Sequence, residues 1–175
     1  VNAGDGADTI NLGLPTSGGF ALTPFNIDPG DAVDYPDGAR AIPVFVNGQA
    51  GEDGVHFLDT AQTAATNLAV LNRTFADIFP SDPPVPGVPH PYWQNLAQGV
   101  FGDNPSSVTY DSVVLQVAAA NSVLNTNARD TEHLKVSLGT GDDVVQLPHG
   151  VLPVDVTVYA GPGNDTFNLP EEYDN

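Results

Sequence analysis

Apolar and polar residues alternate in short runs near both ends of the chain, and this period of two predicts strands. Residues 1–12 read as a strand, a turn and a strand, and the alternation returns in residues 136–145 and 151–169. Glycine-rich turns separate the runs. Short strands of this kind predict a mostly β protein.

A different period runs from Asp59 to Phe79. Apolar side chains recur there at helical spacing, alanines precede them, and Asp59 or Thr60 is a suitable N-cap. The apolar positions are Leu68, Leu71, Phe75 and Ile78. This pattern predicts a helix over about 59–79.

A proline-rich stretch follows from Pro80 to Pro91 and predicts a stiff, extended connection. Tyr92 and Trp93 come directly after it. Aromatic rings beside prolines suit a sugar or a peptide, whereas a single Trp more often packs against its own chain. We favour the packing role for Trp93.

One short motif, Gly-x-Gly-x-Asp, occurs three times, each time between strand-like runs. Its glycines permit positive φ angles and close backbone approach, and its carboxylates supply charged oxygens. The last two copies are 22 residues apart, a plausible length for one coil of a solenoid whose turns stack. The residues of the copies are Gly4, Asp5, Gly6 and Asp8; Gly139, Gly141, Asp142 and Asp143; and Gly161, Gly163, Asn164 and Asp165.

These turns predict calcium sites. Calcium takes six to eight oxygens at about 2.3 to 2.6 Å, more than one turn supplies but within reach of two stacked turns. Asp142 and Asp143 with carbonyls near Gly139 and Gly141 are the expected donors of one turn, and Asp165 and Asn164 those of the next. A tight turn in a metal-free solenoid, where glycine and aspartate serve backbone geometry alone, is the alternative.

The turns resemble those of the RTX family of secreted bacterial proteins, whose repeats form a calcium-loaded parallel β-roll. They are also similar to turns scattered along the β-helical arrays of giant bacterial surface and adhesin-type proteins. The resemblance covers only the turns and their flanking strands, and Ala3, Leu138 and Ala160 stand where the family's first glycine is usual. It implies calcium as cofactor, a location outside the cell, and a structural role.

We therefore expect one domain over residues 1–175, a short parallel β-helix or β-roll-like solenoid. Residues 1–19 and 104–175 are predicted to form repeat coils, and residues 20–103 an insertion with the helix and the proline-rich loop. Residues 50–57 resemble a decayed copy of the turn. Acidic residues at every third position are either a solvated loop or a further cation site; they are Asp28, Asp31, Asp34 and Asp37.

The net charge of the chain limits the classes of partner that we expect it to bind. Acidic residues number 22 against four Lys or Arg, for a net charge of -18, so nucleic acid and anionic membrane surfaces are disfavoured and cations favoured. Solubility or a saline habitat explains such acidity equally well. There is no cysteine for a disulfide or a thiolate zinc site, and no apolar run approaches the roughly 20 residues that span a bilayer. Because the chain begins inside a repeat, we expect a mature segment or a fragment of a longer precursor.

No catalytic pair has diagnostic spacing, so we expect no enzyme. The candidate side chains are Glu52, Asp53, His56, Arg129, Asp130, Glu132 and His133. We expect a calcium-binding building block of a surface layer, adhesin or filament that forms homo-oligomers or polymers by head-to-tail β stacking, with surface glycans as a further partner class. A calcium-binding or secretion-associated module of a larger secreted protein is the alternative, and a polysaccharide-acting enzyme on a β-helix ranks third.

Overall fold

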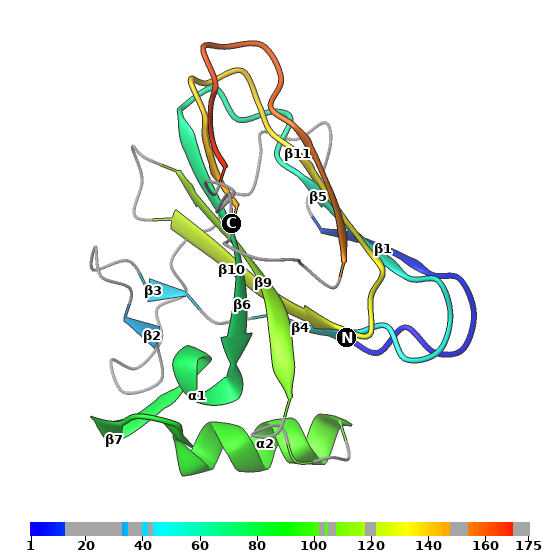
Figure 1. Ribbon diagram of the computed structural model, residues 1–175, viewed down its shortest axis with the longest axis vertical. Helices are drawn as coiled ribbons and strands as arrows, with labels where there is room; N and C mark the ends of the chain where they lie inside the picture. The colour runs from blue at the N-terminus through cyan, green and yellow to red at the C-terminus, as the bar shows by residue number, and fades with distance from the viewer. Residues whose placement is uncertain are drawn as a thin grey trace, which may run out of the picture.

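The protein is mostly β, with two main sheets and two short helices in the part of the chain that the structure describes (Figure 1). The computed structural model describes residues 1–12, 33–34, 40–41, 44–101, 104, 108–117, 122–147 and 154–169. Of the acidic residues at every third position, Asp28, Asp31 and Asp37 lie outside this part, and Asp34 falls in the two-residue strand β2, Val33–Asp34, which pairs with β3, Arg40–Ala41.

The first main sheet has four parallel strands in the order β1, β5, β11 and β13. They span Thr9–Leu12, Gly54–Leu58, His133–Ser137 and Asp155–Tyr159. Its register places like residues side by side in two rows. One row is Ile10, Val55, Leu134 and Val156; the other is Leu12, Phe57, Val136 and Val158. The predicted period of two is confirmed, because these rows form one wall of the core.

The second main sheet has six strands in the order β14, β12, β6, β9, β10 and β4. They span Thr166–Asn168, Val144–Gln146, Thr66–Thr74, Thr109–Val117, Ser122–Arg129 and Val44–Asn47. Val145, Leu68 and Leu115 lie side by side across its middle and are buried against the four-stranded sheet. The core of the protein is the apolar layer between the two sheets.

Strand β9 makes the second sheet mixed, which differs from the all-parallel stack that the sequence predicts. It runs antiparallel to both of its neighbours, β6 and β10. Only residues 118–121 separate β9 from β10, and so short a connection permits antiparallel but not parallel pairing. The sheets are parallel and mixed, and no regular solenoid is detected in the described residues.

The helix predicted over about 59–79 is wrong. Residues Thr66–Thr74 form β6, and only Phe75–Ile78 are helical, as α1. Along β6, Leu68 and Val70 are fully buried while Leu71 is 37% exposed, so burial follows a period of two. Apolar residues at helical spacing also satisfy part of a strand pattern, and pairing with β9 and β12 on the two sides decides for the strand.

A second apolar cluster covers the far end of the long strands. Thr74 caps α1 with a capping box, in which its hydroxyl accepts from the Asp77 N–H and the Asp77 carboxylate accepts from the Thr74 N–H. The side chains of Phe75, Phe79 and Tyr110 pack there. The hairpin of β7, Pro80–Val85, and β8, Val88–Pro89, leads to α2, Pro91–Phe101, which lies below β9 in Figure 1.

Helix α2 was not predicted. It begins at Pro91, a favourable first helical residue because its missing N–H would have no intrahelical partner there. Trp93 on α2 stacks on Phe79 with ring centroids 4.8 Å apart. The packing role predicted for Trp93 is therefore confirmed.

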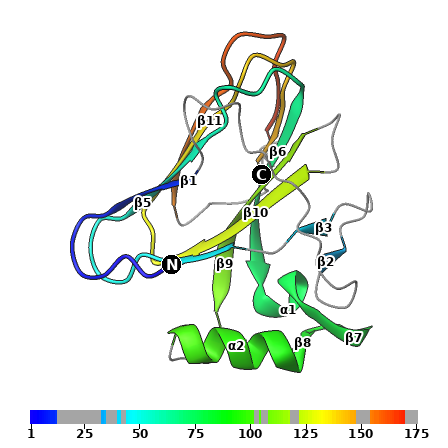
Figure 2. The same ribbon diagram turned by 180° about the vertical axis from the view of Figure 1, so that it is seen from behind.

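The stretch predicted as an insertion, residues 20–103, contributes strands to both main sheets. β5 lies between β1 and β11 in the parallel sheet, while β6 and β4 belong to the mixed sheet. Figures 1 and 2 show β1, β5 and β11 side by side from both directions. Residues 44–74 are therefore part of the framework that positions the turns.

Candidate metal centre

Three turns connect the parallel sheet to the mixed sheet and lie one on another at the top of Figure 1. We call residues 59–65, 138–143 and 160–165 the first turn stack. The contact is so close that a Cβ added to Gly139 would lie 1.8 Å from the Gln62 carbonyl oxygen, and one added to Gly161 would lie 2.0 Å from that of Gly139. The predicted stacking of the two motif copies 22 residues apart is confirmed.

Carboxylates join the turns of this stack to one another. Asp143 Oδ1 accepts from the Thr66 N–H at 2.7 Å, and Asp165 Oδ1 accepts from the Asp143 N–H at 3.0 Å. Asp142 Oδ1 accepts from the Asn164 N–H at 2.8 Å. The turns at 138–143 and 160–165 thus each use an acidic side chain to satisfy a backbone donor in or next to the preceding turn, and Asp142 also satisfies one in the turn that follows.

Asp143 is the buried centre of the stack. Its side chain is 1% exposed, and its second oxygen, Oδ2, has no hydrogen-bond partner among the described residues. Burial raises the pKa of Asp143, and the nearby Asp165 and Asp142 carboxylates raise it further, although the Thr66 N–H opposes the shift. An ionised Asp143 therefore favours a compensating positive charge nearby.

A second set of turns leads from the mixed sheet to the parallel sheet. We call residues 3–8, 48–53 and 130–132 the second turn stack. The Gly6 N–H donates to the Ala50 carbonyl oxygen at 2.9 Å, and the Asp8 N–H donates to Asp53 Oδ1 at 2.8 Å. The N-terminal copy of the motif is therefore completed by a distant turn of the same chain, visible as the blue and cyan loops in Figures 1 and 2.

The second stack continues by the same kind of contact. The Asp53 N–H donates to Glu132 Oε2 at 2.6 Å, so Glu132 has the role that Asp165 has in the first stack. Neither Asp53 nor Glu132 was predicted as a metal ligand, although Asp53 lies in the stretch at 50–57 that resembles a decayed copy of the turn. The sequence contains one weak sign of this turn. Gly48, Gly51 and Asp53 follow a spacing that departs by one residue from Gly-x-Gly-x-Asp.

The predicted metal residues divide into buried and exposed groups. Gly139, Gly141 and Asp143 are buried, and Asp165 is half-buried. The turn residues at the surface are Asp5, Gly6, Asp142, Gly161, Gly163 and Asn164, with Gly4 and Asp8 half-buried. Gly4 and Gly6 adopt φ angles of 105° and 128°, which favour glycine.

The donor set fits a cation only if backbone oxygens take part. Among the described residues, no group of three or more His, Asp or Glu side chains converges on a metal position. A Cβ on Gly163 would lie 2.1 Å from the Gly141 carbonyl oxygen and 3.1 Å from Asp165 Oδ1, so a carbonyl and a carboxylate oxygen face the same glycine. These two oxygens and the unpartnered Asp143 Oδ2 are all oxygen donors of the kind that hard cations prefer.

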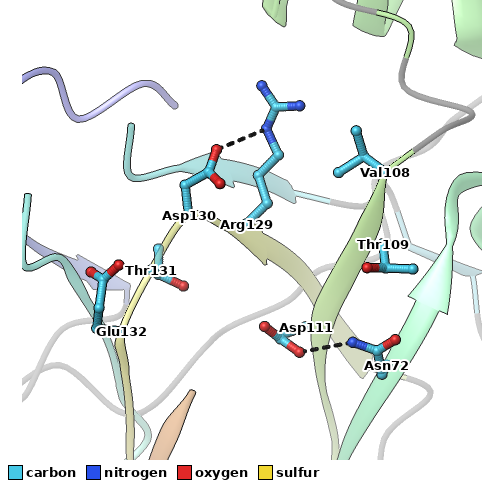
Figure 3. Close-up of a pocket in the computed structure, with 8 residues that line it drawn as sticks. All are labelled: Asn72, Val108, Thr109, Asp111, Arg129, Asp130, Thr131 and Glu132. Atoms are coloured by element: carbon cyan, nitrogen blue, oxygen red, sulfur yellow. Dashed lines mark hydrogen bonds and ion pairs between the residues drawn. The ribbon is translucent and has the colours of Figure 1, made fainter. Parts of the chain in front are cut away.

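A polar cleft of about 460 Å³ lies where β9 extends past the turn at 130–132 (Figure 3). The residues that line it are Asn72, Val108, Thr109, Asp111, Arg129, Asp130, Thr131 and Glu132. Three of the catalytic candidates, Arg129, Asp130 and Glu132, are among them. Glu52, His56 and His133 line a separate hollow of about 260 Å³, and Asp53 is buried in the second turn stack.

The carboxylates of the cleft each have a structural contact. Asp111 Oδ1 accepts from the Asn72 amide at 3.1 Å, Asp130 lies 3.7 Å from Arg129 Nε, and Glu132 accepts from the Asp53 N–H. Burial raises the pKa of Asp111, and the Asn72 hydrogen bond only partly offsets this. We therefore assign these carboxylates a structural role first.

No family model, curated protein or solved structure matches this chain. No helix within the described ranges is long and apolar enough to cross a membrane. The function of the protein is therefore inferred from the two turn stacks.

Replacement of Gly139 by Ala is expected to destabilise the protein by about 1 to 3 kcal/mol, because the added methyl group meets the Gln62 backbone and cannot displace it freely. Urea denaturation measures the loss. Gly99→Ala is the matched control, since Gly99 lies in α2 with open space around it, and this change should stabilise by roughly 0.5 to 1 kcal/mol. Equal midpoints for both variants would contradict the close stacking.

Asp111→Asn tests the buried carboxylate of the cleft. A folded pKa above the ordinary 3.8 means that the protonated group stabilises the fold at low pH and that this contribution is lost as pH rises through the folded pKa. The variant cannot ionise and keeps an acceptor for Asn72. Wild-type stability relative to the variant should fall in urea titrations as the pH rises above about 4 and through the folded pKa. A difference that rises with pH would show that Asp111 is stabilised as the anion.

Proposed function

We propose that this protein is a calcium-binding structural module that acts outside the cell. The observation that carries the proposal is the buried, unpartnered Oδ2 of Asp143 inside a glycine turn that has no room for side chains. A buried carboxylate oxygen without a hydrogen bond is costly unless a cation or a proton accompanies it. The net charge of -18 makes cations the favoured companions throughout the molecule.

Calcium is the cation that best suits these donors. The turns contain oxygen ligands only, and the chain has no cysteine to favour a softer metal. Asp143 and Asp165 would hold the ion with carbonyl oxygens of Gly139 and Gly141, and Asp142 and Asn164 at the surface would complete the set. Bound calcium would supply positive charge among carboxylates that otherwise repel one another.

The order of the strands supports a short β-roll-like solenoid as the finer description of the fold. β5, β11 and β13 each lead through the first turn stack into the mixed sheet, as β6, β12 and β14. β4 and β10 lead through the second turn stack into β5 and β11. We call each such strand–turn–strand unit a coil. In this description β9 is an extra strand inserted between two coils.

The C-terminal coil suggests how copies associate. Among the described strands, β13 pairs only with β11 and β14 only with β12, so each has one edge without a neighbour. Tyr159, Phe167 and Leu169 are large apolar residues exposed on this coil. A second copy that adds its strands here would satisfy the edge and cover the apolar side chains. This supports a building block of a surface layer, adhesin or filament; a calcium-binding or secretion-associated module of a larger secreted protein is the alternative.

Calcium should raise the thermal midpoint of the protein. At a hundredfold excess over the dissociation constant, one site stabilises the folded state by about 2.7 kcal/mol, or roughly 5 to 11 °C for a chain of this size. Differential scanning calorimetry with calcium and then with chelator measures the shift.

Asp143→Asn is the matched variant, because its amide oxygen still accepts from the Thr66 N–H while the charge is gone. The variant should lose the calcium-dependent shift that arises from the first turn stack. Asp155→Asn is the control, since the Asp155 side chain is 89% exposed on the edge strand β13. An Asp143→Asn protein that binds as many calcium ions as the wild type, with unchanged affinity, would refute the first site.

Association through the last coil should appear in sedimentation. With millimolar calcium, we expect species larger than the monomer, and Phe167→Asp should shift them to monomer by placing a charge on the apolar edge. Leu71→Asp is the control, because Leu71 is exposed on β6, which has strands on both sides. A purely monomeric wild type at high protein concentration would count against head-to-tail stacking.

A further inference from the structure

Three buried side-chain oxygens without a partner belong to residues in or directly beside the second turn stack. They are Asn47 Oδ1, Asp53 Oδ2 and Thr131 Oγ1, and each has no hydrogen-bond partner among the described residues. Their residues are only 5%, 1% and 7% exposed. Three such atoms within two neighbouring turns are unusual, because buried polar groups in folded proteins nearly always have partners.

The backbone holds these residues together from two directions. Asn47 ends β4 and Asp53 precedes β5, so the two residues flank one turn. Thr131 belongs to the adjacent turn between β10 and β11, which is tied to the first by bonds from the Gly48 N–H to the Arg129 carbonyl and from the Glu132 N–H to the Asp53 carbonyl. These bonds measure 3.1 and 2.9 Å.

Gly48 brings one further oxygen, a backbone carbonyl, beside Asp53 Oδ2. A Cβ on Gly48 would lie 1.8 Å from the carbonyl oxygen of Asp130 and 2.9 Å from Asp53 Oδ2. The absence of a side chain therefore lets a backbone carbonyl and a carboxylate oxygen face one glycine, as Gly163 does in the first turn stack. The other oxygen of Asp53 is already used by the Asp8 N–H.

We propose that this place is a second, independent calcium site. Its ligands are the side-chain oxygens of Asn47, Asp53 and Thr131 and the carbonyl oxygen of Asp130, with water completing the shell. A carboxylate with neutral oxygens from an amide, a hydroxyl and a carbonyl is a donor set that hard cations prefer. The site does not depend on the first one, because it shares no residue with the first turn stack and uses no residue of the Gly-x-Gly-x-Asp copies.

A substitution at Thr131 distinguishes a cation site from a buried turn that binds no ion. If nothing binds, Thr131→Val removes a buried hydroxyl that has no partner and should leave the protein at least as stable as the wild type. If calcium binds, the same change removes a ligand and should weaken that site at least tenfold. The wild type and the Thr131→Val variant are compared for stability in chelator and for calcium binding in calcium.

Calorimetric titration of the full chain with calcium alone counts the sites. We expect two sites in the wild type, loss of one in Asp53→Asn, loss of the other in Asp143→Asn, and none in the double variant. Asp53→Asn keeps an acceptor for the Asp8 N–H, and Thr131→Val keeps the test decisive should that variant fail to fold. Circular dichroism checks that each protein is folded.

The outcomes separate the two sites. Unchanged binding in both Asp53→Asn and Thr131→Val overturns this inference and leaves the Asp143 site standing. Loss of all binding in Asp53→Asn, with none lost in Asp143→Asn, supports this site and overturns the other. A titration with no heat and no calcium-dependent shift in any protein overturns both, and ordered water then accounts for the buried oxygens.

Discussion

The contact on which the structure depends is a hydrogen bond from the backbone N–H of one turn to the carboxylate of the next. It occurs at Thr66, Asp143, Asp8 and Asp53, always at the residue just before or at the start of a strand. Hydrogen bonds to charged groups contribute about 1.5 to 3 kcal/mol each. Because a slip of one residue would break these bonds and turn the apolar rows outward, they also fix the register of the parallel sheet.

The same contact creates an electrostatic problem. Two of the carboxylates that reach a neighbouring turn, Asp143 and Asp53, are buried there, and the second oxygen of each has no hydrogen-bond partner among the described residues. Asp165 and Asp142 add negative charge beside Asp143. Acidic side chains stabilise these turns only while a positive charge or a proton offsets their negative charge. The geometry of the turns is therefore linked to the acidic composition of the whole chain.

The sequence predicted that the turns at 138–143 and 160–165 stack, because their motif copies repeat at the length of one coil. It did not predict the third member of that stack, because residues 59–65 lie in the segment with helical spacing. It did not predict the partner of the N-terminal copy, since Asp8 and Asp53 are 45 residues apart and the glycines of the second turn are spaced differently. The helix error had another cause. Leu68 and Phe75 fit both periods, and only the long-range pairing of β6 with β9 settles the choice.

Four carboxylate contacts share one direction. In each, the acid comes from the turn that is later in the sequence: Asp143 serves Thr66, Asp165 serves Asp143, Asp53 serves Asp8, and Glu132 serves Asp53. A chain that emerges with its N-terminus first would therefore expose amides in each turn that stay unsatisfied until the following turn has left the ribosome or the secretion channel. Completion of these four contacts is vectorial, whereas the Asn164 N–H of the last turn meets its acceptor, Asp142, in a turn that has already emerged.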